Sequence, residues 1–114
     1  MLSKDVRRIG AEMMREMAEV LLATHGLKRA DVRHWILHSA GRRVLDRARV
    51  LLDLTDEQVA PSRGVLRRYG NMASAAIIFV VEETLRTGTP VAGDWGALIG
   101  LGPGFAAEGA LLRF

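Results

Sequence analysis

Two polar residues stand where a side chain can be aimed into a cleft. His38 ends a short apolar run, residues 34–37, and Asn71 follows Gly70 at the start of a longer one. An imidazole or an amide fixed at such a place can donate a hydrogen bond to negative charge that develops during a reaction. Each residue also has a structural interpretation, His38 as a buried hydrogen-bonded side chain and Asn71 as a helix N-cap. The residues alone leave both interpretations open.

The chain contains no cysteine, so it has no disulfide, no thiolate metal ligand and no thiol nucleophile. His25 and His34 match no catalytic arrangement, and we interpret both as structural or surface residues. No spacing of His, Asp and Glu predicts a metal site. Any thiol chemistry therefore needs a cysteine from another segment.

Composition indicates one folded domain spanning residues 1–114, with 49% hydrophobic and 25% charged residues. The net charge is only +3, and Arg is interleaved with Asp and Glu, so we expect no nucleic-acid partner. The N-terminus lacks the apolar core of a signal peptide. The longest apolar stretch, Met72 to Val81, is about half the ~20 residues of a spanning helix, so we expect no membrane partner and a cytoplasmic location.

Hydrophobic spacing predicts the elements of the first half. Residues 4–24 form an amphipathic helix that ends at Gly26. Residues 34–38 form a buried strand that runs into a tight turn at Ser39-Ala40-Gly41, and residues 42–52 form a second helix. The apolar face predicted for the first helix consists of Val6, Ile9, Met13, Met17, Val20 and Leu21.

The second half continues with a capped helical turn at residues 54–59, with Thr55 as N-cap and Gln58 three residues later; Pro61 should stop it. The helix at Met72 to Val81 has apolar residues on every side and should be buried nearly all round. Two strands, residues 95–101 and 105–112, are joined by Gly102-Pro103-Gly104, a sequence suited to a hairpin turn.

The expected order is α-β-α-α-β-β, with buried helices packed on a small mixed sheet, which indicates the α/β class. Three strands form a thin sheet, too small to cover two helices that carry so many apolar residues. The pattern suggests that a partner or a further segment covers part of the core.

Three segments, WILH at residues 35–38, RYGNMAS at 68–74 and DWGALIGLGPGF at 94–105, together resemble the C-terminal domain of chalcone synthases and other type III polyketide synthases. Their order, their spacing and the Gly-x-Gly-Pro-Gly loop carry the resemblance. It extends over essentially the whole chain. The resemblance implies a thiolase-like fold, of which residues 1–114 form the second half only and the nucleophile-bearing N-terminal half is absent.

What the resemblance implies chemically is condensation of an acyl-CoA with malonyl-CoA in polyketide biosynthesis, with CoA thioesters as substrates and no cofactor. The family's His corresponds to His38 and its Asn to Asn71, and the Cys lies on the other half. The resemblance further implies that the loop Gly102-Pro103-Gly104 shapes the cavity in which the polyketide cyclises. Ala73 stands where plant enzymes commonly have Ser. We therefore expect a Cys-bearing N-terminal half as partner, inactivity without it, and a homo-oligomer.

Two other interpretations remain. Ketoacyl synthase III shares the fold and both positions, but its His is usually followed by Gln-Ala-Asn and its late loop lacks Pro, so Ser39-Ala40-Gly41 and Pro103 favour the polyketide synthases. Those enzymes themselves usually have Pro-Gly-Gly after the His, so the turn that orients His38 can differ here. The third interpretation is a non-catalytic domain for self-association or partner binding.

Overall fold

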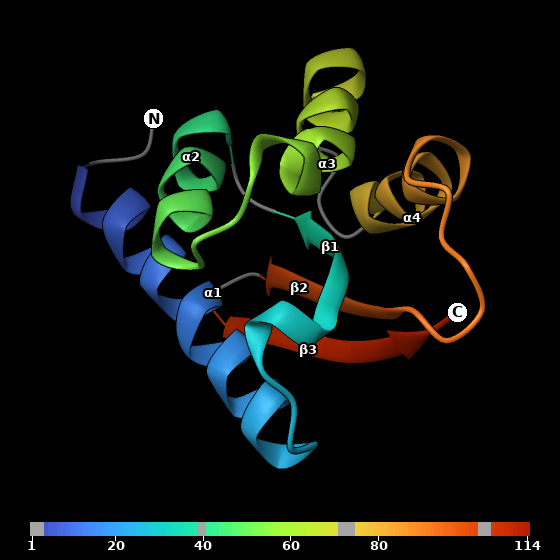
Figure 1. Cartoon of the computed structure of the whole chain (residues 1–114). Helices are drawn as coiled ribbons and strands as arrows, with labels where there is room; N and C mark the ends of the chain where they lie inside the picture. The colour runs from blue at the N-terminus through green and yellow to red at the C-terminus, as the bar shows by residue number, and fades with distance from the viewer. Residues whose placement is uncertain (1–3, 39–40, 71–74, 103–105) are drawn as a thin grey trace.

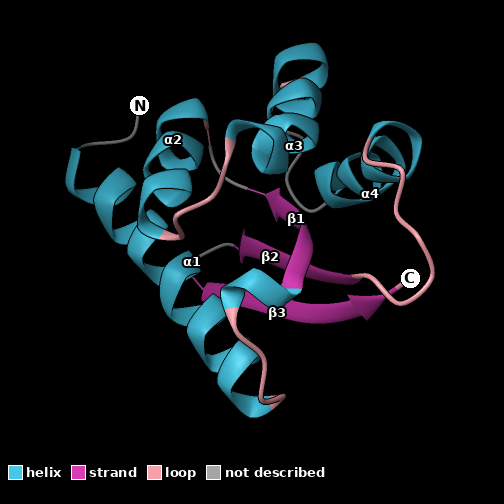
Figure 2. Ribbon diagram, in the orientation of Figure 1, coloured by secondary structure: helices cyan, strands magenta, loops and turns pink. Residues whose placement is uncertain are grey.

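The structure is a computed structural model that describes residues 4–38, 41–70, 75–102 and 106–114. Within these ranges lie a long first helix, a first strand, three more helices and two final strands (Figures 1 and 2). The α/β class is confirmed, with one more helix between the first two strands than we expected. The elements are α1 (Lys4–Thr24), a short 3₁₀ helix (Arg29–Asp31), β1 (Val32–His38), α2 (Arg42–Leu51), α3 (Asp56–Tyr69), α4 (Ala75–Thr87), β2 (Trp95–Gly102) and β3 (Ala106–Arg113).

The strands of the described ranges form a mixed sheet, as predicted, and their order is β1-β2-β3. β1 and β2 run parallel, and this pairing places His38 beside Gly100. β2 and β3 run antiparallel, with Trp95 opposite Arg113 at one end. The two late strands thus pair as the hairpin prediction required, whereas the turn residues 103–105 lie outside the described ranges.

Helices cover both faces of the sheet (Figure 1). On one face, Trp35 and Leu37 of β1 join Ile99 of β2 in a buried core with α1 and α2. On the other face, Ile36 packs with Val80 of α4. Alternation of side chains along β1 therefore divides the core in two, and it puts His34, Ile36 and His38 on the α4 face.

The buried face of α1 agrees only in part with the predicted one: Met17 and Leu21 pack against the core as expected. Ile9 and Val20 are exposed, and the fully buried residues are Ala11, Met14 and Ala18. The two alanines are among the buried residues because α1 lies very close to the sheet. A Cβ added at Gly109 of β3 would lie only 2.6 Å from Leu21 Cδ1.

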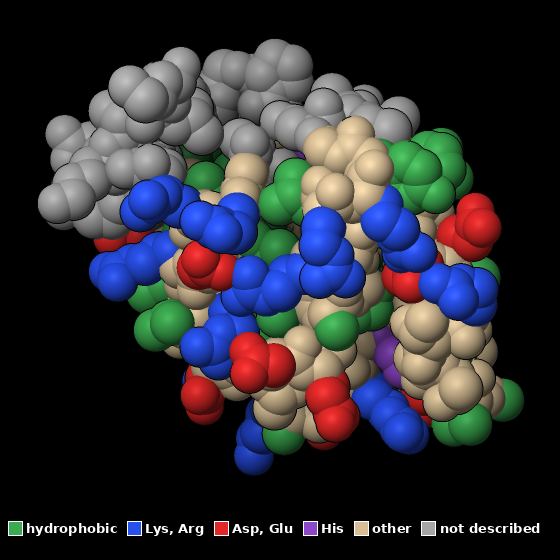
Figure 3. Space-filling model, turned by 90° about the horizontal axis from the view of Figure 1, so that it is seen from above, with side chains coloured by type: hydrophobic (Ala, Val, Ile, Leu, Met, Phe, Trp, Pro, Cys, Tyr) green, Lys and Arg blue, Asp and Glu red, His purple; other side chains and the backbone are tan. Residues whose placement is uncertain are grey.

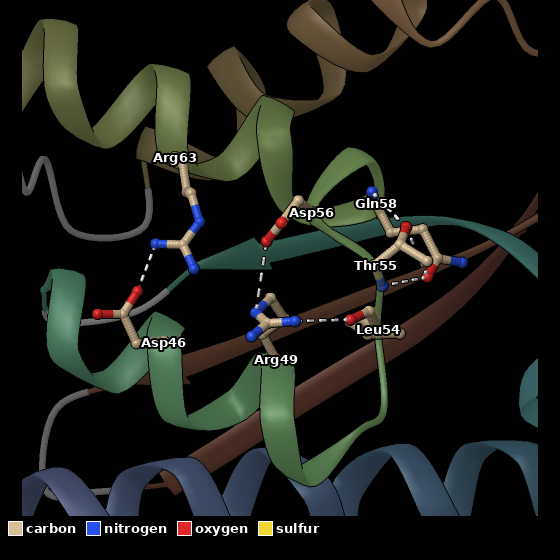
Figure 4. Close-up of polar contacts among 7 residues, drawn as sticks. All are labelled: Asp46, Arg49, Leu54, Thr55, Asp56, Gln58 and Arg63. Carbon is tan, nitrogen blue, oxygen red and sulfur yellow. Dashed lines mark hydrogen bonds and ion pairs between the residues drawn. The ribbon is translucent and has the colours of Figure 1, made fainter.

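The predicted capping box at the start of α3 is confirmed. The backbone N–H of Gln58 donates to Thr55 Oγ1 at 3.2 Å, and the backbone N–H of Thr55 donates to Gln58 Oε1 at 2.9 Å (Figure 4). The expectation that Pro61 stops this helix was wrong, because α3 continues to Tyr69 with Pro61 inside it. Pro61 is buried, and tertiary packing here outweighs the low helix propensity of proline.

Polar contacts fasten α3 to its neighbours. Arg63 of α3 pairs with Asp46 of α2, and Arg49 reaches both the Leu54 carbonyl and Asp56 (Figure 4). Beneath them, the buried backbone N–H of Leu37 donates to Ser62 Oγ at 3.1 Å. These contacts hold α3 along the β1 edge of the sheet.

The expectation that the helix after Asn71 is buried nearly all round was wrong for this chain. In α4, Val80 is buried against the sheet, but Ile78 is 69% exposed and Leu85 53% exposed. The aromatic ring of Phe79 contacts Tyr69 of α3, with ring centroids 5.0 Å apart. The outward side of α4 is thus an apolar surface at the chain's exterior, where the sequence pattern alone predicted burial.

Basic and acidic side chains are interspersed over the face shown in Figure 3. Glu83 of α4, for example, pairs with Arg86 at 2.6 Å and with Arg68 of α3 at 2.8 Å. The Arg86 hydrogen bond first and the Arg68 hydrogen bond second hold the pKa of Glu83 below its ordinary value. Among the helices of the described ranges, none has the length and hydropathy needed to cross a bilayer.

Candidate active site

His38 is the last residue of β1 and lies on the sheet face that α4 covers. Its side chain is 8% exposed, so the imidazole is largely removed from water. Burial at the carboxyl end of a strand gives the ring a fixed position and a low-dielectric surrounding. Both properties strengthen a hydrogen bond that the ring donates to a charged or polarised group.

Gly100 of β2 lies between His38 and Ile77 of α4. A Cβ placed on Gly100 would lie 3.6 Å from His38 Cβ and 3.7 Å from His38 Nδ1. The same point is 3.2 Å from Cδ1 of Ile77, the third residue of α4. His38, Gly100 and Ile77 therefore meet at one place, contributed by three different elements.

Of the other predicted site residues, the structure describes Gly102. Asn71, Ala73, Pro103 and Gly104 lie outside the described ranges, so their predicted roles stay predictions. Gly102 is the last residue of β2, paired with Ala106. The elements that follow Asn71 and that precede Pro103 in the sequence, α4 and β2, are the two that meet His38.

His34 occupies the opposite end of the same face. It is buried, its Nε2 lies 2.9 Å from Asp94 Oδ2, and its ring makes an edge contact with Phe114. Asp94 also accepts a hydrogen bond from the Val91 backbone N–H at 3.0 Å. The Val91 hydrogen bond first and the His34 hydrogen bond second lower the pKa of Asp94.

A cavity of about 590 Å³ adjoins His34, between the start of α3 and the end of α4. Arg33, Gln58 and Thr84 are among its lining residues. Thr84 already donates its hydroxyl hydrogen to the Val80 carbonyl at 2.8 Å. The His34–Asp94 pair therefore joins β1 to the loop before β2 beside this cavity, in agreement with the structural role expected for His34.

His25 lies at the surface, with Nδ1 2.9 Å from the Leu21 carbonyl. The described part of the chain contains no group of three or more His, Asp or Glu side chains that could hold a metal ion. Of the three histidines, His38 alone is placed where α4 and the end of β2 converge.

Comparison with known proteins shows the family to which this domain belongs. The family model of the C-terminal domain of chalcone and stilbene synthases matches residues 1–114. The chain is a member of the chalcone and stilbene synthase family. It is also 40% identical, over 98 residues, to 3,5-dihydroxyphenylacetyl-CoA synthase of Amycolatopsis balhimycina. That match covers 86% of this chain and 26% of the relative, so the chain spans about a quarter of that protein's length.

Solved structures agree with the assignment. PKS-I of the brown alga Ectocarpus siliculosus superposes with a TM-score of 0.85 at 36% identity, over 98% of this chain and 31% of that one. Ketoacyl-[acyl carrier protein] synthase III of Thermus thermophilus gives a TM-score of 0.84 at 27% identity, over 100% of this chain and 35% of that one. The thiolase-like fold is thus confirmed, and this domain shares it with the Thermus thermophilus ketoacyl synthase.

Sequence reasoning missed the relation between His38 and Gly100. The signal was present, because Gly100 opens the Gly-x-Gly-Pro-Gly motif. As a loop motif, it predicts a role only for residues 102–104. The parallel register shows that its first glycine belongs to a strand beside the candidate catalytic histidine.

Proposed function

We propose that this domain supplies His38 and Asn71 to a condensing site that joins an acyl-CoA with malonyl-CoA, and that a Cys-bearing N-terminal half completes the site. The observation that supports the proposal is the match of residues 1–114 to the C-terminal domain of chalcone and stilbene synthases, with His38 buried at the end of β1. No cysteine is present in the chain. We therefore expect no condensation by the chain alone.

The proposed roles follow from the charge that develops. In the malonyl thioester the bond to the carboxylate breaks, carbon dioxide leaves, and the electron pair becomes an enolate. His38 and Asn71 donate hydrogen bonds to the thioester oxygen, where the enolate charge accumulates. The enolate carbon then attacks the acyl group on the Cys, forms the new carbon–carbon bond and expels the thiolate.

The burial of His38 supports its role, since a donor in a dry site needs little reorganisation when charge develops. We assign Gly102, Pro103, Gly104 and Ala73 to the wall of the cavity in which the product cyclises.

The apolar outward side of α4 supports the partner that the proposal requires. Ile78 and Leu85 are exposed large hydrophobic residues on one helix, a feature typical of a surface that another chain or domain covers. We assign this surface to the Cys-bearing half. We further expect the completed synthase to be a homo-oligomer.

The test is to mix this chain with a Cys-bearing N-terminal half of a similar synthase and to follow release of free CoA from malonyl-CoA and an acyl-CoA. We expect turnover in the mixture and none with either half alone. His38→Ala should abolish it, whereas His25→Ala, at the exposed histidine, should not. A folded mixture without turnover would contradict the proposal and favour a non-catalytic interaction domain.

A second candidate is a ketoacyl synthase III-like reaction, favoured by the TM-score of 0.84 with the Thermus thermophilus enzyme. The two reactions differ in the carrier of the malonyl group, which is CoA in the first and an acyl carrier protein in the second. Turnover with malonyl-acyl carrier protein and none with malonyl-CoA would establish the second candidate.

A further inference from the structure

Gly100 lies at the point where β1, β2 and α4 meet. It pairs with His38 in the parallel register, and Leu98, two residues earlier in β2, packs against the core on the α4 face. Side chains alternate along a strand, so a side chain at position 100 would project to the same face, between His38 and α4. The nearest atom to such a side chain is Ile77 Cδ1, 3.2 Å from the ideal Cβ.

Space, not backbone conformation, accounts for this glycine. Gly100 does not have the left-handed φ that is found at Gly26, Gly70 and Gly93. It lies within β2, where a β-branched residue would be favoured by strand propensity. A methyl group there would be in ordinary contact with His38 and too close to Ile77.

We infer that Gly100 is a positioning residue for His38, because its bare backbone lets the first turn of α4 lie against the sheet directly beside the imidazole. This inference rests on the proposed function, in which His38 acts on the thioester. Catalytic groups must be held within about 0.5 Å of their productive geometry. The methyl group of an alanine at position 100 would lie between Ile77 and the imidazole, and a shift of a few tenths of an ångström on either side uses up most of that tolerance.

The chain offers a matched control on the same strand and the same face. Gly96 pairs with His34 as Gly100 pairs with His38. A Cβ on Gly96 would lie 2.9 Å from Cε2 of Phe114. Gly96→Ala thus adds the same methyl group at the strand position paired with the other buried histidine. Its contact with Phe114 would be at least as close as the contact of the Gly100→Ala methyl group with Ile77, but it lies away from His38 and the first turn of α4.

The experiment compares Gly100→Ala, Ile77→Val, the double variant Gly100→Ala with Ile77→Val, and Gly96→Ala. Replacing Ile77 by Val removes Cδ1, the atom that the new methyl group would meet. Two quantities are measured: kcat and KM for His38-dependent CoA release in the mixture with the Cys-bearing half, and the imidazole NMR signals of His38 in the chain alone. Thermal unfolding of each variant shows whether it folds.

We expect Gly100→Ala to lower kcat about three- to tenfold with little change in KM, since a misplacement of about 1 Å can cost on the order of a hundredfold. The His38 signals should shift in that variant. The double variant should recover most of kcat and the original signals. Gly96→Ala should lower the unfolding midpoint and leave kcat and the His38 signals unchanged.

The inference is overturned if Gly100→Ala folds with unchanged kcat and unchanged His38 signals, or if the double variant recovers neither. If Gly100→Ala does not fold, a folded double variant with the original His38 signals supports it, and a double variant that also does not fold contradicts it. Absence of His38-dependent turnover in the unaltered mixture would refute the proposed function instead. In that case the imidazole signals still decide whether Gly100 positions His38.

Discussion

The imidazole of His34, 6% exposed, and the carboxylate of Asp94, 14% exposed, form a pair in which Nε2 lies 2.9 Å from Oδ2. The pair joins β1 to the residue that precedes β2. It lies on the same sheet face as His38 but at the other end of β1. The two histidines, only four residues apart, thus lie in different surroundings: His34 ties β1 to the loop before β2, and His38 is buried at the end of β1 beside α4.

Asp94→Asn should change how stability depends on pH. The hydrogen bonds from Val91 first and His34 second lower the pKa of Asp94 below its ordinary value of 3.8. At pH values between the lowered folded pKa and the unfolded pKa, the unfolded state therefore binds more protons than the folded state. The stabilising contribution is fully present above about pH 5 and is lost as the pH falls through the lowered folded pKa.

Thermal unfolding between pH 2 and 7 measures this effect, with Asp53→Asn on the loop after α2 as control. The unaltered chain should lose part of its stability on acidification, and Asp94→Asn should have a lower midpoint at neutral pH and a flatter acid limb. Parallel curves for Asp94→Asn and the unaltered chain would contradict the role assigned to the pair.

Ser62→Ala should destabilise the chain by about 1–3 kcal/mol, because the buried backbone N–H of Leu37 would lose its acceptor. Denaturant unfolding monitored by tryptophan fluorescence gives the free energy of unfolding. Thr87→Ala removes an exposed hydroxyl on α4 and should change it by less than about 0.5 kcal/mol. Equal effects of the two variants would show that the hydrogen bond between Ser62 and Leu37 does not contribute to the free energy of unfolding.

Gly109→Ala should destabilise the chain by about 1–3 kcal/mol through overpacking. Its Cβ would lie 2.6 Å from Leu21 Cδ1 and 2.9 Å from Met17 Cγ, so α1 would have to move away from β3. Ala110→Val, at the neighbouring exposed position, adds bulk on the other side of the same strand. If both variants unfold at the denaturant concentration of the unaltered chain, α1 does not pack on β3 as closely as the structure describes.

Ile78→Lys and Leu85→Lys should leave folding of the chain almost unchanged, within about 0.5 kcal/mol, because both side chains are exposed. They should reduce binding of an apolar dye and lower CoA release in the mixture, since a Lys placed in the proposed interface would be buried without a partner. Val50→Lys, at an exposed valine of α2, is the matched control. Unimpaired turnover with Ile78→Lys would show that the Cys-bearing half does not bind to the outward side of α4.

Much of the fold could be predicted because its signals are local. Thr55 and Gln58 carry a capping box within four residues, and it formed as predicted. Pro61 misled the prediction because its neighbours Ser62, Gly64 and Val65 are buried against the rest of the chain, and that packing holds the helix together. The exposure of Ile78 could not be foreseen either, since apolar residues on every side of a helix do not say which side the chain itself covers.

The site could be predicted only in part. The resemblance to the family identified His38, and the structure places it at a buried strand end. The contact among His38, Gly100 and Ile77 depends on the parallel register of two strands and on the depth at which α4 packs. No short-range pattern in the sequence specifies either property.

The most direct test of the central claim is the decarboxylation of malonyl-CoA, measured as carbon dioxide release in the mixture of this chain with a Cys-bearing half. If His38 stabilises the developing enolate, His38→Ala should lower the rate about 10²- to 10³-fold, and His38→Gln, which keeps an N–H donor, should retain more of it. Decarboxylation at the unaltered rate in folded His38→Ala would contradict the claim that this histidine carries the chemistry.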